Sequence, residues 1–527
     1  MSSIKILDCT LRDGGYVNNW MFGERGIKKI ISKLSQANID IIECGFLTYK
    51  GGNKDTTLFK DVSKVKDYII DKKDNIMYVG MIAYPNSVIS NIPVYDGKSI
   101  DGIRVTFHES EIEEALEVCK DLMYKGYKVF VQPICVASYD DLNLINLINK
   151  VNDIKPYAFY IVDTLGSLYK NNLLRMYYLI DNNLNKDIHI GFHSHNNLQL
   201  SFSNAQELMM LQTKRTIIID SSVFGMGRGS GNLCTELLAQ YINVSLVERY
   251  NIEYLLEIID EHLNNIYAKY SWGYSAPYCL AAINNCHPNY ATYLMDKQTI
   301  TIKSISTILK NMHAEKRVVY DKGYIEQVYM EYQKKYIDDN DDLEKLKNTI
   351  NGKKVLILAP GKSLEVNRNL INDIIDNDNL FVISINFIPK AINSDYVFIS
   401  NQKRFDELAD IIKIAERANL ILTSNITANL NNIYSIVNYS DLLIDNQLIS
   451  DNAGLMLINL LNRLSVHEIY LAGFDGYAIN KNNYLESDME LVKTNKNIIE
   501  MNKAVRESIQ RLRLTLDIRF ITKSKYN

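Results

Sequence analysis

The first half of the chain alternates short apolar runs with segments of helical spacing. Eight apolar runs can be read there: Ile4–Asp8, Ile39–Phe46, Met77–Tyr84, Gly102–His108, Lys128–Val136, Ala158–Thr164, His189–His195 and Thr216–Phe224. Short continuous apolar runs are typical of buried parallel strands, and helices between them are typical of βαβ units. This pattern predicts a closed (β/α)8 TIM barrel over residues 1–240. An open doubly wound sheet is the structural alternative, and the even spacing favours closure.

The pattern changes after the barrel. Residues 241–330 contain longer helical stretches broken by polar turns and are expected to form a helical extension; residues 331–352 are polar and charged and are expected to be a linker. An α/β pattern resumes over 353–527, with strands expected at Val355–Leu358, Leu380–Ile385, Tyr396–Ile399, Leu420–Thr423, Leu442–Ile444, Glu468–Ala472 and Ile518–Ile521. Helices between these strands predict a Rossmann-like, doubly wound α/β domain.

Composition narrows the class of protein. The chain has 527 residues, 47% hydrophobic and 23% charged, which is typical of a globular protein of two or three domains. A formal net charge of −4 argues against a nucleic-acid polymer as partner. Seven cysteines without CxxC spacing indicate reduced thiols, and no apolar run is long enough for a membrane span. We expect a cytoplasmic protein, and a homodimer is compatible with this sequence.

Polar residues collect where the barrel strands end, which is where the active site of this fold lies. They are Asp13, Glu43, His108, Asp163, His193, His195 and Gly225. Strand alternation places His193 and His195 on one face, and with Asp13 they form a mixed N and O ligand set for an open divalent-metal site. The alternative is a pair of satisfied core histidines.

Several neighbouring residues allow two interpretations. Arg12 is expected to bind an anionic ligand, or else to form a structural ion pair. Glu43 either binds substrate or orients Arg12. Asp163 and Thr164 either bind substrate or form an ordinary turn at a strand end.

Three motifs together carry a family resemblance: Leu11-Arg12-Asp13-Gly14, His193-Ser194-His195-Asn196 and Gly229-Ser230-Gly231-Asn232. Over roughly residues 1–290 the chain resembles the HMG-CoA lyase-like family of metal-dependent barrels (DRE-TIM metallolyases). This family includes 4-hydroxy-2-oxovalerate aldolase, HMG-CoA lyase, and the isopropylmalate and homocitrate synthases. Cys9–Gly15 and Glu43–Phe46 are most similar to the pyruvate aldolases of this group.

The resemblance implies that Asp13, His193 and His195 hold Mn²⁺ or Mg²⁺, and that Arg12 faces the oxygen of the enolate. Asn232 matches a residue that reaches the metal in the lyases, although it could instead cap the next helix. The implied reaction forms or cleaves a carbon–carbon bond through a metal-bound enolate of pyruvate type, with an aldehyde as partner. The alternative is a Claisen-type condensation with an acyl-CoA, which the lack of a cysteine ahead of the Gly-Asn motif disfavours.

One position departs from the family. The hydroxy-oxovalerate aldolases have a catalytic histidine three residues after the metal-binding aspartate, where this chain has Tyr16. A phenol with a pKa near 10 is a poor base at neutral pH. Tyr16 is expected to donate a hydrogen bond to the acceptor oxygen, or to cover the pocket. Tyr290 and a metal-bound water are further candidates for proton transfer.

The C-terminal domain resembles bacterial sialyltransferase-like domains of surface-glycan proteins in Ile357–Leu364, in the strand before Asn386 and in Ile469–Gly476. The resemblance implies nucleotide binding by Gly361, Lys362, Ser363 and Asp475, and an aldolase that acts on or beside an activated sugar in polysaccharide biosynthesis, with a sugar-derived aldehyde. The glycine loop could instead be an ordinary strand-to-helix turn. The catalytic histidine of the transferases is not evident, so the domain could also be a nucleotide-sugar or protein-recognition module without chemistry.

Overall fold

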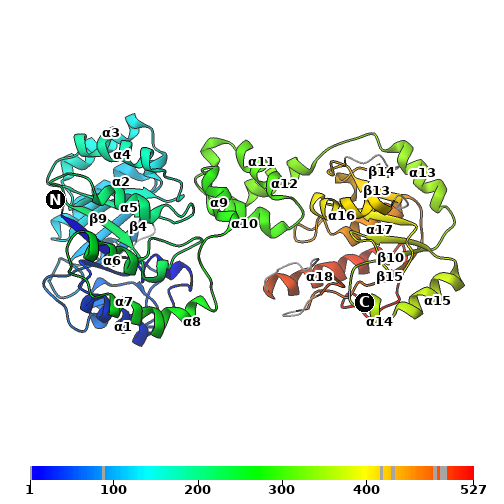
Figure 1. Ribbon diagram of the computed structural model, residues 1–527, viewed down its shortest axis with the longest axis horizontal. Helices are drawn as coiled ribbons and strands as arrows, with labels where there is room; N and C mark the ends of the chain where they lie inside the picture. The colour runs from blue at the N-terminus through cyan, green and yellow to red at the C-terminus, as the bar shows by residue number, and fades with distance from the viewer. Residues whose placement is uncertain are drawn as a thin grey trace. The chain divides into compact units, whose positions relative to one another are not determined.

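The protein consists of two compact units, each with its own parallel sheet (Figure 1). The computed structural model describes residues 3–85, 89–415, 419–428, 434–478, 483–486, 489 and 495–527. The first unit contains Met1–Ala291 and His313–Tyr320, and the second contains Thr292–Met312 and Asp321–Asn527.

The first unit is a closed parallel barrel. Its eight strands are β1 (Ile4–Asp8), β2 (Ile41–Leu47), β4 (Met77–Ala83), β5 (Gly102–Phe107), β6 (Lys128–Pro133), β7 (Ala158–Asp163), β8 (His189–Ser194) and β9 (Ile217–Ser221). Strand β1 pairs with both β2 and β9, which closes the sheet, and the two-residue β3 (Leu58–Phe59) lies beside β2. The predicted TIM barrel is confirmed, and the open-sheet alternative is wrong.

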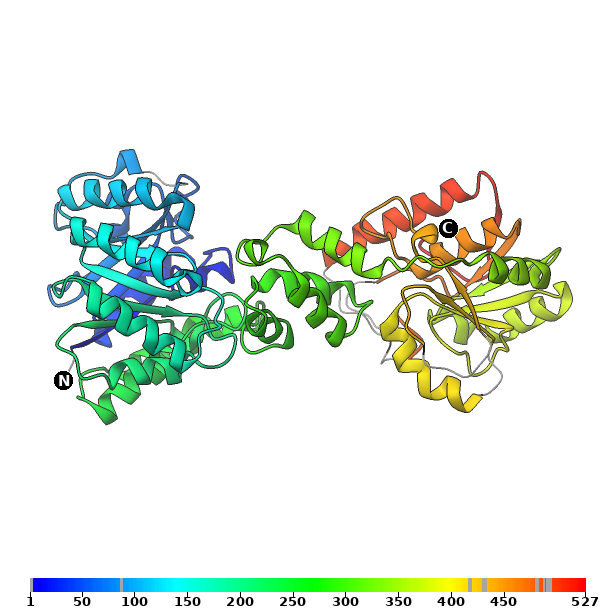
Figure 2. The same cartoon turned by 90° about the horizontal axis from the view of Figure 1, so that it is seen from above.

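Amphipathic helices surround the barrel (Figure 2). They are α1 (Glu24–Gln36), α2 (Ile112–Tyr124), α3 (Asp141–Ile154), α4 (Lys170–Asn183), α5 (Ser201–Met209) and α6 (Thr235–Ser245). In α1, Ile27, Ile30, Ile31 and Leu34 recur at helical spacing and all are buried, because this stripe packs on the sheet while the charged face meets water. α7 (Ile252–Ile258) packs against α1 and continues through a π-helical turn (Ile259–Leu263) into α8 (Asn264–Tyr267).

The helical extension and linker differ from the prediction. The boundary between the units falls within the expected extension, at Ala291: α9 (Ala276–Ile283) belongs to the first unit, α11 (Ile302–Asn311) and α12 (Lys322–Gln333) belong to the second, and α10 (Pro288–Lys297) spans the boundary.

The expected linker, residues 331–352, contains α13 (Asn340–Ile350), which is part of the second core. Leu346 and Ile350 are buried, and Asp342 accepts a hydrogen bond from the backbone N–H of Ile436 at 2.9 Å. The acidic run suggested a solvated connection, but Asp339 is buried and accepts a hydrogen bond from the backbone N–H of Asn438 at 2.8 Å, so part of the run is bonded to the second core.

The second unit is a seven-stranded parallel sheet of order β14-β13-β12-β11-β10-β15-β16. The strands are β10 (Val355–Leu358), β11 (Phe381–Ile385), β12 (Tyr396–Ile399), β13 (Asn419–Thr423), β14 (Tyr434–Val437), β15 (Glu468–Ala472) and β16 (Asp517–Phe520). Its other helices are α14 (Ser363–Val366), α15 (Arg368–Asp378), α16 (Gln402–Ala415), α17 (Ala453–Arg463) and α18 (Asn495–Leu512). The strand order reverses beside β10, as a doubly wound sheet requires.

Both faces of this sheet are covered, which explains its continuous apolar strands. In β10, Val355 and Ile357 share a core with α17 and α18, while Leu356 and Leu358 point to the opposite face, toward α15. Figure 2 shows α16 (yellow) and α18 (red) on opposite sides of the sheet. The Rossmann-like architecture predicted for residues 353–527 is therefore confirmed.

One predicted strand of this domain is wrong. Leu442–Ile444 was expected to be a strand, but Ser440–Leu442 is a 3₁₀ turn, and the edge strand is Tyr434–Val437. Leu442 is buried although its backbone turns, so a short apolar run here reflects burial and not an extended backbone.

Within the described part of the chain, the helices are too short or too polar to cross a lipid bilayer.

Candidate active site at the carboxyl end of the barrel

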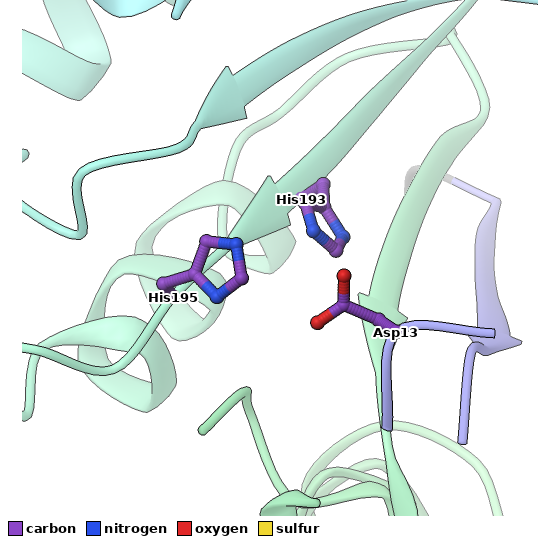
Figure 3. A group of neighbouring side chains, drawn as sticks. All are labelled: Asp13, His193 and His195. Atoms are coloured by element: carbon purple, nitrogen blue, oxygen red, sulfur yellow. The ribbon is translucent and has the colours of Figure 1, made fainter. Parts of the chain in front are cut away.

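Three potential metal ligands converge at the carboxyl ends of β1 and β8. Asp13 lies in the turn after β1, His193 is on β8, and His195 follows directly after that strand. One ligand atom from each of the three side chains lies within 4.8 Å of the others. Figure 3 shows the Asp13 carboxylate facing the two imidazole rings. Residues about 180 positions apart in the sequence therefore form one mixed N and O donor set, in the arrangement that the sequence predicted.

The turn after β1 holds Asp13 in place. The backbone N–H groups of Arg12 and Asp13 both donate to the carbonyl of Cys9, at 3.1 and 2.8 Å. Gly15 lies beneath the ring of Trp20, and a Cβ at this position would come within 2.1 Å of a ring atom. Trp20 in turn donates from Nε1 to the carbonyl of Arg12 at 2.8 Å. The glycine after the Arg-Asp pair is thus required for a tight turn that is closed by an indole.

Arg12 links two carboxylates of the site. Its Nη1 donates to Oδ1 of Asp13 at 2.5 Å, and its Nε donates to Oε2 of Glu43 at 2.8 Å. All three side chains are buried. Glu43 therefore lies where it can orient Arg12, which is one of the two roles considered for it.

The same carboxylate of Glu43 continues a chain of charges across the barrel interior. Glu43 Oε2 also accepts from Nη1 of Arg104 at 2.7 Å, and Arg104 donates through Nη2 to Oδ2 of Asp220. Asp220 Oδ2 lies 2.9 Å from Nδ1 of His193. Because Nδ1 of His193 is engaged by a carboxylate, its Nε2 is left for a metal, and this is the usual carboxylate–histidine arrangement of metal sites.

The electrostatics of the site favour a cation. Burial opposes ionisation of Asp13, but Arg12 and the surrounding groups outweigh it and hold the pKa of this carboxyl well below its usual range. Burial lowers the pKa of His195 to about 3, so its imidazole is neutral and free to coordinate. Burial likewise opposes ionisation of Asp220, but Arg104 and His193 outweigh it and lower its pKa. Three carboxyl groups, of Asp13, Glu43 and Asp220, lie beside the two guanidinium groups of Arg12 and Arg104, and a bound divalent cation would offset an excess of negative charge.

Polar atoms at the site are buried without a partner among the described residues. They include Nη2 of Arg12, Oε1 of Glu43 and Oδ1 of Asn232. A buried polar atom without a hydrogen bond costs about 1–3 kcal/mol. Such atoms, gathered at one point, indicate that a ligand supplies the missing partners.

Asn232 lies beside the three potential ligands. Its Nδ2 donates to Oδ2 of Asp13 at 2.7 Å, and its backbone forms a bridge with His195. Gly231 has a φ of +79°, and a Cβ there would lie 2.2 Å from the carbonyl of Gly225, so glycine is needed to fold this loop against itself. The N-cap of α6 is Cys234, so Asn232 is not the cap of this helix.

Tyr16 stands at the mouth of the barrel with 40% of its surface exposed. Its ring packs edge-on against Trp20 and Phe46, with centroids 4.7 and 6.0 Å away. Loss of hydration raises the pKa of the phenol, although Arg12 opposes the shift. Tyr16 is therefore protonated at neutral pH, which favours a hydrogen-bond donor over a base.

Asp163 and Thr164 stabilise loops at the mouth. The two carboxylate oxygens of Asp163 accept from the backbone N–H groups of Ser167 and Leu168, at 3.0 and 3.1 Å, and burial raises its pKa to about 6. The hydroxyl of Thr164 accepts from the backbone N–H of Cys135 at 2.9 Å. These contacts match the turn interpretation of the two residues.

Tyr290 is buried in α10 and bonds to the backbone of a neighbouring segment. Its hydroxyl lies 2.8 and 2.7 Å from the backbone carbonyls of Lys316 and Val319. These bonds hold the segment that contains Lys316 and Val319, and a role of Tyr290 in proton transfer stays a prediction.

The four residues expected to bind a nucleotide lie at the carboxyl ends of β10 and β15. Asp475 accepts from the backbone N–H of Ser363 at 2.9 Å and from its hydroxyl. A Cβ at Gly361 would lie 2.2 Å from the carbonyl of Gly473, and Lys362 is exposed. Gly361, Ser363 and Asp475 therefore join two strand-end turns to each other.

A cavity of about 670 Å³ opens at the same end of this sheet. Its lining includes Gly361, Asn386, Arg404, Asp475 and Tyr484, but not Lys362 or Ser363. The cavity thus lies where the strand order reverses, the usual ligand position of a doubly wound sheet.

The sequence analysis missed Arg104, Asp220 and Arg228. The signal for Arg104 is a charge in the middle of the apolar strand Gly102–Phe107, and the signal for Asp220 is a charge near the end of Ile217–Ser221. Arg228, on the glycine loop, places its guanidinium 5.4 Å from the centre of the Tyr16 ring. The local sequence around Arg228 does not predict its contact with Tyr16.

The first half of the chain is similar in sequence to known proteins. Residues 98–260 match the family model HMGL-like. The chain is 25% identical to an oxaloacetate decarboxylase of Mycobacterium tuberculosis over 44% of this chain and 68% of the relative, and 25% identical to a 4-hydroxy-2-oxovalerate aldolase of Geobacillus genomosp. 3 over 48% and 72%. A solved N-terminal domain from Bacteroides vulgatus is 27% identical over 57% of this chain and 98% of that domain, with a TM-score of 0.49.

Proposed function

We propose that this chain, whose barrel belongs to the HMGL-like family of carbon–carbon lyases, is an aldolase that joins pyruvate to an aldehyde or cleaves the product. The observation that carries the proposal is the convergence of Asp13, His193 and His195 beside the guanidinium of Arg12. Both curated relatives named above act on 2-oxo acids by their printed names, and an enolate of pyruvate is common to aldol cleavage and to decarboxylation of oxaloacetate.

The donor set fits Mn²⁺ or Mg²⁺. Asp13, His193 and His195 would hold the ion, and Oδ1 of Asn232, which is buried without a partner among the described residues, is available as a further oxygen ligand. When bound, such an ion supplies Lewis-acid polarisation of the 2-oxo acid. The carboxylate of Asp220 fixes the ring of His193, and Asn232 fixes the carboxylate of Asp13.

The protein side chains then have distinct roles. In the condensing direction the methyl group of pyruvate loses a proton, the resulting carbon bonds to the aldehyde carbon, and the aldehyde oxygen takes a proton to give a 4-hydroxy-2-oxo acid. The unpaired Nη2 of Arg12 is placed to stabilise negative charge on the enolate oxygen, while Glu43 holds the guanidinium in position. Tyr16, whose phenol is protonated at neutral pH, donates a hydrogen bond to the aldehyde oxygen.

Exchange of the methyl protons of pyruvate in D₂O tests this proposal. With Mn²⁺ and pyruvate alone, the protein should replace methyl hydrogen by deuterium, as followed by NMR. Metal-free protein and protein with Arg12→Ala should not. Absence of exchange with Mn²⁺ and with Mg²⁺ would contradict the proposal. Exchange of the methyl protons of acetyl-CoA without exchange of pyruvate would indicate the Claisen-type alternative.

For the C-terminal domain we propose that the cavity beside β10 binds a nucleotide or nucleotide sugar. The position of the cavity at the reversal of the strand order and its volume of about 670 Å³ support this, because such crevices are the common ligand sites of this fold. Since the Ser363 N–H is engaged by Asp475, a ligand would lie in the cavity and not on that amide. A polysaccharide context and a sugar-derived aldehyde remain predictions.

Thermal-shift measurements with a set of nucleotides distinguish a nucleotide-binding C-terminal domain from a protein-recognition domain. CMP, CDP, UDP and GDP compounds should raise the melting temperature of the second unit if the cavity binds nucleotides. Asn386→Trp, which fills the cavity from its wall, should abolish the shift. Silence across the panel would favour the protein-recognition alternative.

A further inference from the structure

We infer that Arg228 recognises an anionic group on the aldehyde, so that the second substrate of this barrel is an aldehyde acid or an aldehyde phosphate. The inference rests on the proposed function and deepens it. Arg228 lies on the glycine loop between β9 and α6, the same loop whose Asn232 bonds to Asp13. Its guanidinium stands 5.4 Å from the centre of the Tyr16 ring.

The guanidinium is available for a ligand. Among the described residues, Arg228 forms no ion pair or side-chain hydrogen bond, whereas Arg12 in the turn after β1 and Arg104 in the barrel interior are each engaged by two carboxylates. The positive charge of Arg228 also acts on His195, one of the three potential metal ligands, and on His287. The side chain of Arg228 is exposed and lies over the ring of Tyr16, where a ligand at the mouth can reach it.

The loop presents this guanidinium from a fixed position. The backbone N–H of Gly231 donates to the carbonyl of Arg228 at 3.2 Å, and the N–H of Gly273 donates to the carbonyl of Gly229 at 3.1 Å. Trp272 donates from Nε1 to the carbonyl of Phe224 at 2.9 Å, at the start of the loop. A backbone held from both sides reduces the entropy lost when the guanidinium binds an anion.

In this arrangement, the groups that bind pyruvate and the groups that bind the aldehyde lie next to each other at the mouth. Pyruvate occupies the side of Arg12 and the potential metal ligands, the phenol of Tyr16 meets the aldehyde oxygen, and Arg228 lies over that phenol on the loop side. An acceptor that bonds to the Tyr16 hydroxyl would thus extend its other end toward Arg228. A carboxylate or phosphate a few bonds from the aldehyde matches the planar fork of a guanidinium.

The test compares matched acceptors in the presence of Mn²⁺ and pyruvate. Succinic semialdehyde and butanal have the same chain length and differ in the carboxylate; glyceraldehyde 3-phosphate and glyceraldehyde differ in the phosphate. The wild-type protein should prefer one anionic acceptor over its neutral partner by about 10- to 100-fold in kcat/KM. The arm that shows the preference identifies the anion as carboxylate or phosphate.

Arg228→Gln should reduce that preference to about one by raising the KM of the anionic acceptor, while Arg228→Lys should retain part of it. The exchange of pyruvate in D₂O, measured without any acceptor, should be unchanged in both variants. Arg175→Gln is the matched control, because Arg175 is an exposed arginine of α4 that pairs with Asp141 outside the mouth. This control should keep the full preference.

Three results would overturn the inference. They are a wild-type protein that does not favour either anionic acceptor, an unchanged preference in Arg228→Gln, and a variant whose defect lies in pyruvate exchange, which would assign Arg228 to the donor. Failure of the wild-type protein to exchange pyruvate is a separate result that removes the proposed aldolase function itself.

Discussion

Both units place an aspartate in a glycine turn at the end of a parallel strand, and the two aspartates have different partners. Asp13, after β1, accepts from the side chains of Arg12 and Asn232 and faces two imidazoles. Asp475, after β15, accepts from the backbone and hydroxyl of Ser363, in the turn after a neighbouring strand. Similar local sequence therefore contributes to a candidate ligand site in the first case and to a link between two turns in the second.

The surroundings of the two aspartates differ in whether buried polar atoms have hydrogen-bond partners among the described residues. Around Asp13, Arg12, Glu43 and Asn232 each keep a buried polar atom without a partner among the described residues. The carboxylate of Asp475 has a hydrogen bond to each oxygen. An aspartate is thus informative about function when its neighbours are left incomplete, because a folded protein seldom tolerates unpaired buried polar atoms without a ligand.

The largest expected effect comes from removing a ligand of the barrel site. His193→Ala should weaken Mn²⁺ binding by at least about 100-fold, because even the outer partners of metal ligands are worth 10- to 100-fold. Pyruvate exchange should fall by about 10³-fold with it. Metal analysis after dialysis and NMR exchange measure the two effects.

His189→Gln is the control for that experiment. His189 begins the same strand, β8, and packs against Tyr157 at the other end of the barrel. It should retain both metal and exchange. Equal loss in the two variants would mean that damage to the strand, and not loss of a ligand, is responsible.

Arg12→Lys should separate charge stabilisation from metal binding. Lysine keeps the positive charge but lacks the planar guanidinium fork that bonds Asp13 and Glu43 and directs a further N–H toward the enolate oxygen. We expect exchange to slow by about 10²- to 10³-fold, with metal content unchanged. A variant that loses the metal as well would show that Arg12 mainly holds Asp13.

In the second unit, Asp475→Ala should affect stability and leave chemistry intact. The backbone N–H of Ser363 would lose its acceptor, so the free energy of unfolding of this unit should fall by about 1–3 kcal/mol, as measured in urea. Pyruvate exchange should be unaffected, and Asp475→Asn should recover part of the stability. Loss of exchange in Asp475→Ala would break the contrast between the two aspartates.

A third aspartate extends the comparison to the pH dependence of stability. Asp8, in β1, is buried and accepts hydrogen bonds from the hydroxyl of Thr235 and the backbone N–H of Thr10, but burial outweighs them and raises its pKa from 3.8 to about 6. Because the folded state holds this proton more tightly than the unfolded state does, the contribution of Asp8 to stability falls as the pH rises from about 4 to 6.

Asp8→Asn removes that dependence. The wild-type protein should gain stability relative to the variant as the pH is lowered from 7 to 4, by up to about 3 kcal/mol. Urea titrations at several pH values give the difference. A difference that is independent of pH would show that the Asp8 carboxyl has an ordinary pKa.

Much of the architecture could be predicted from local patterns alone. The eight apolar runs, their spacing and the helical stripe of α1 define a (β/α)8 barrel, because burial on both faces of a parallel strand removes polar residues from it. The prediction failed at two places where the sequence pattern does not match the burial. Leu442 is buried in a turn, and the acidic run before Lys353 contains Asp339, which is buried, and Asp342, which accepts a hydrogen bond from the backbone of Ile436.

Part of the candidate site could be predicted from the sequence, and part of it is visible only in the tertiary structure. Residue chemistry and strand alternation alone selected Asp13, His193 and His195, because position at a strand end depends on neighbours in the chain. Tertiary structure alone revealed the chain of charges through Arg104 and Asp220 and the position of Arg228 over Tyr16. These contacts join residues from different strands and loops, and only closure of the barrel brings such distant side chains within the few ångströms over which hydrogen bonds and ion pairs act.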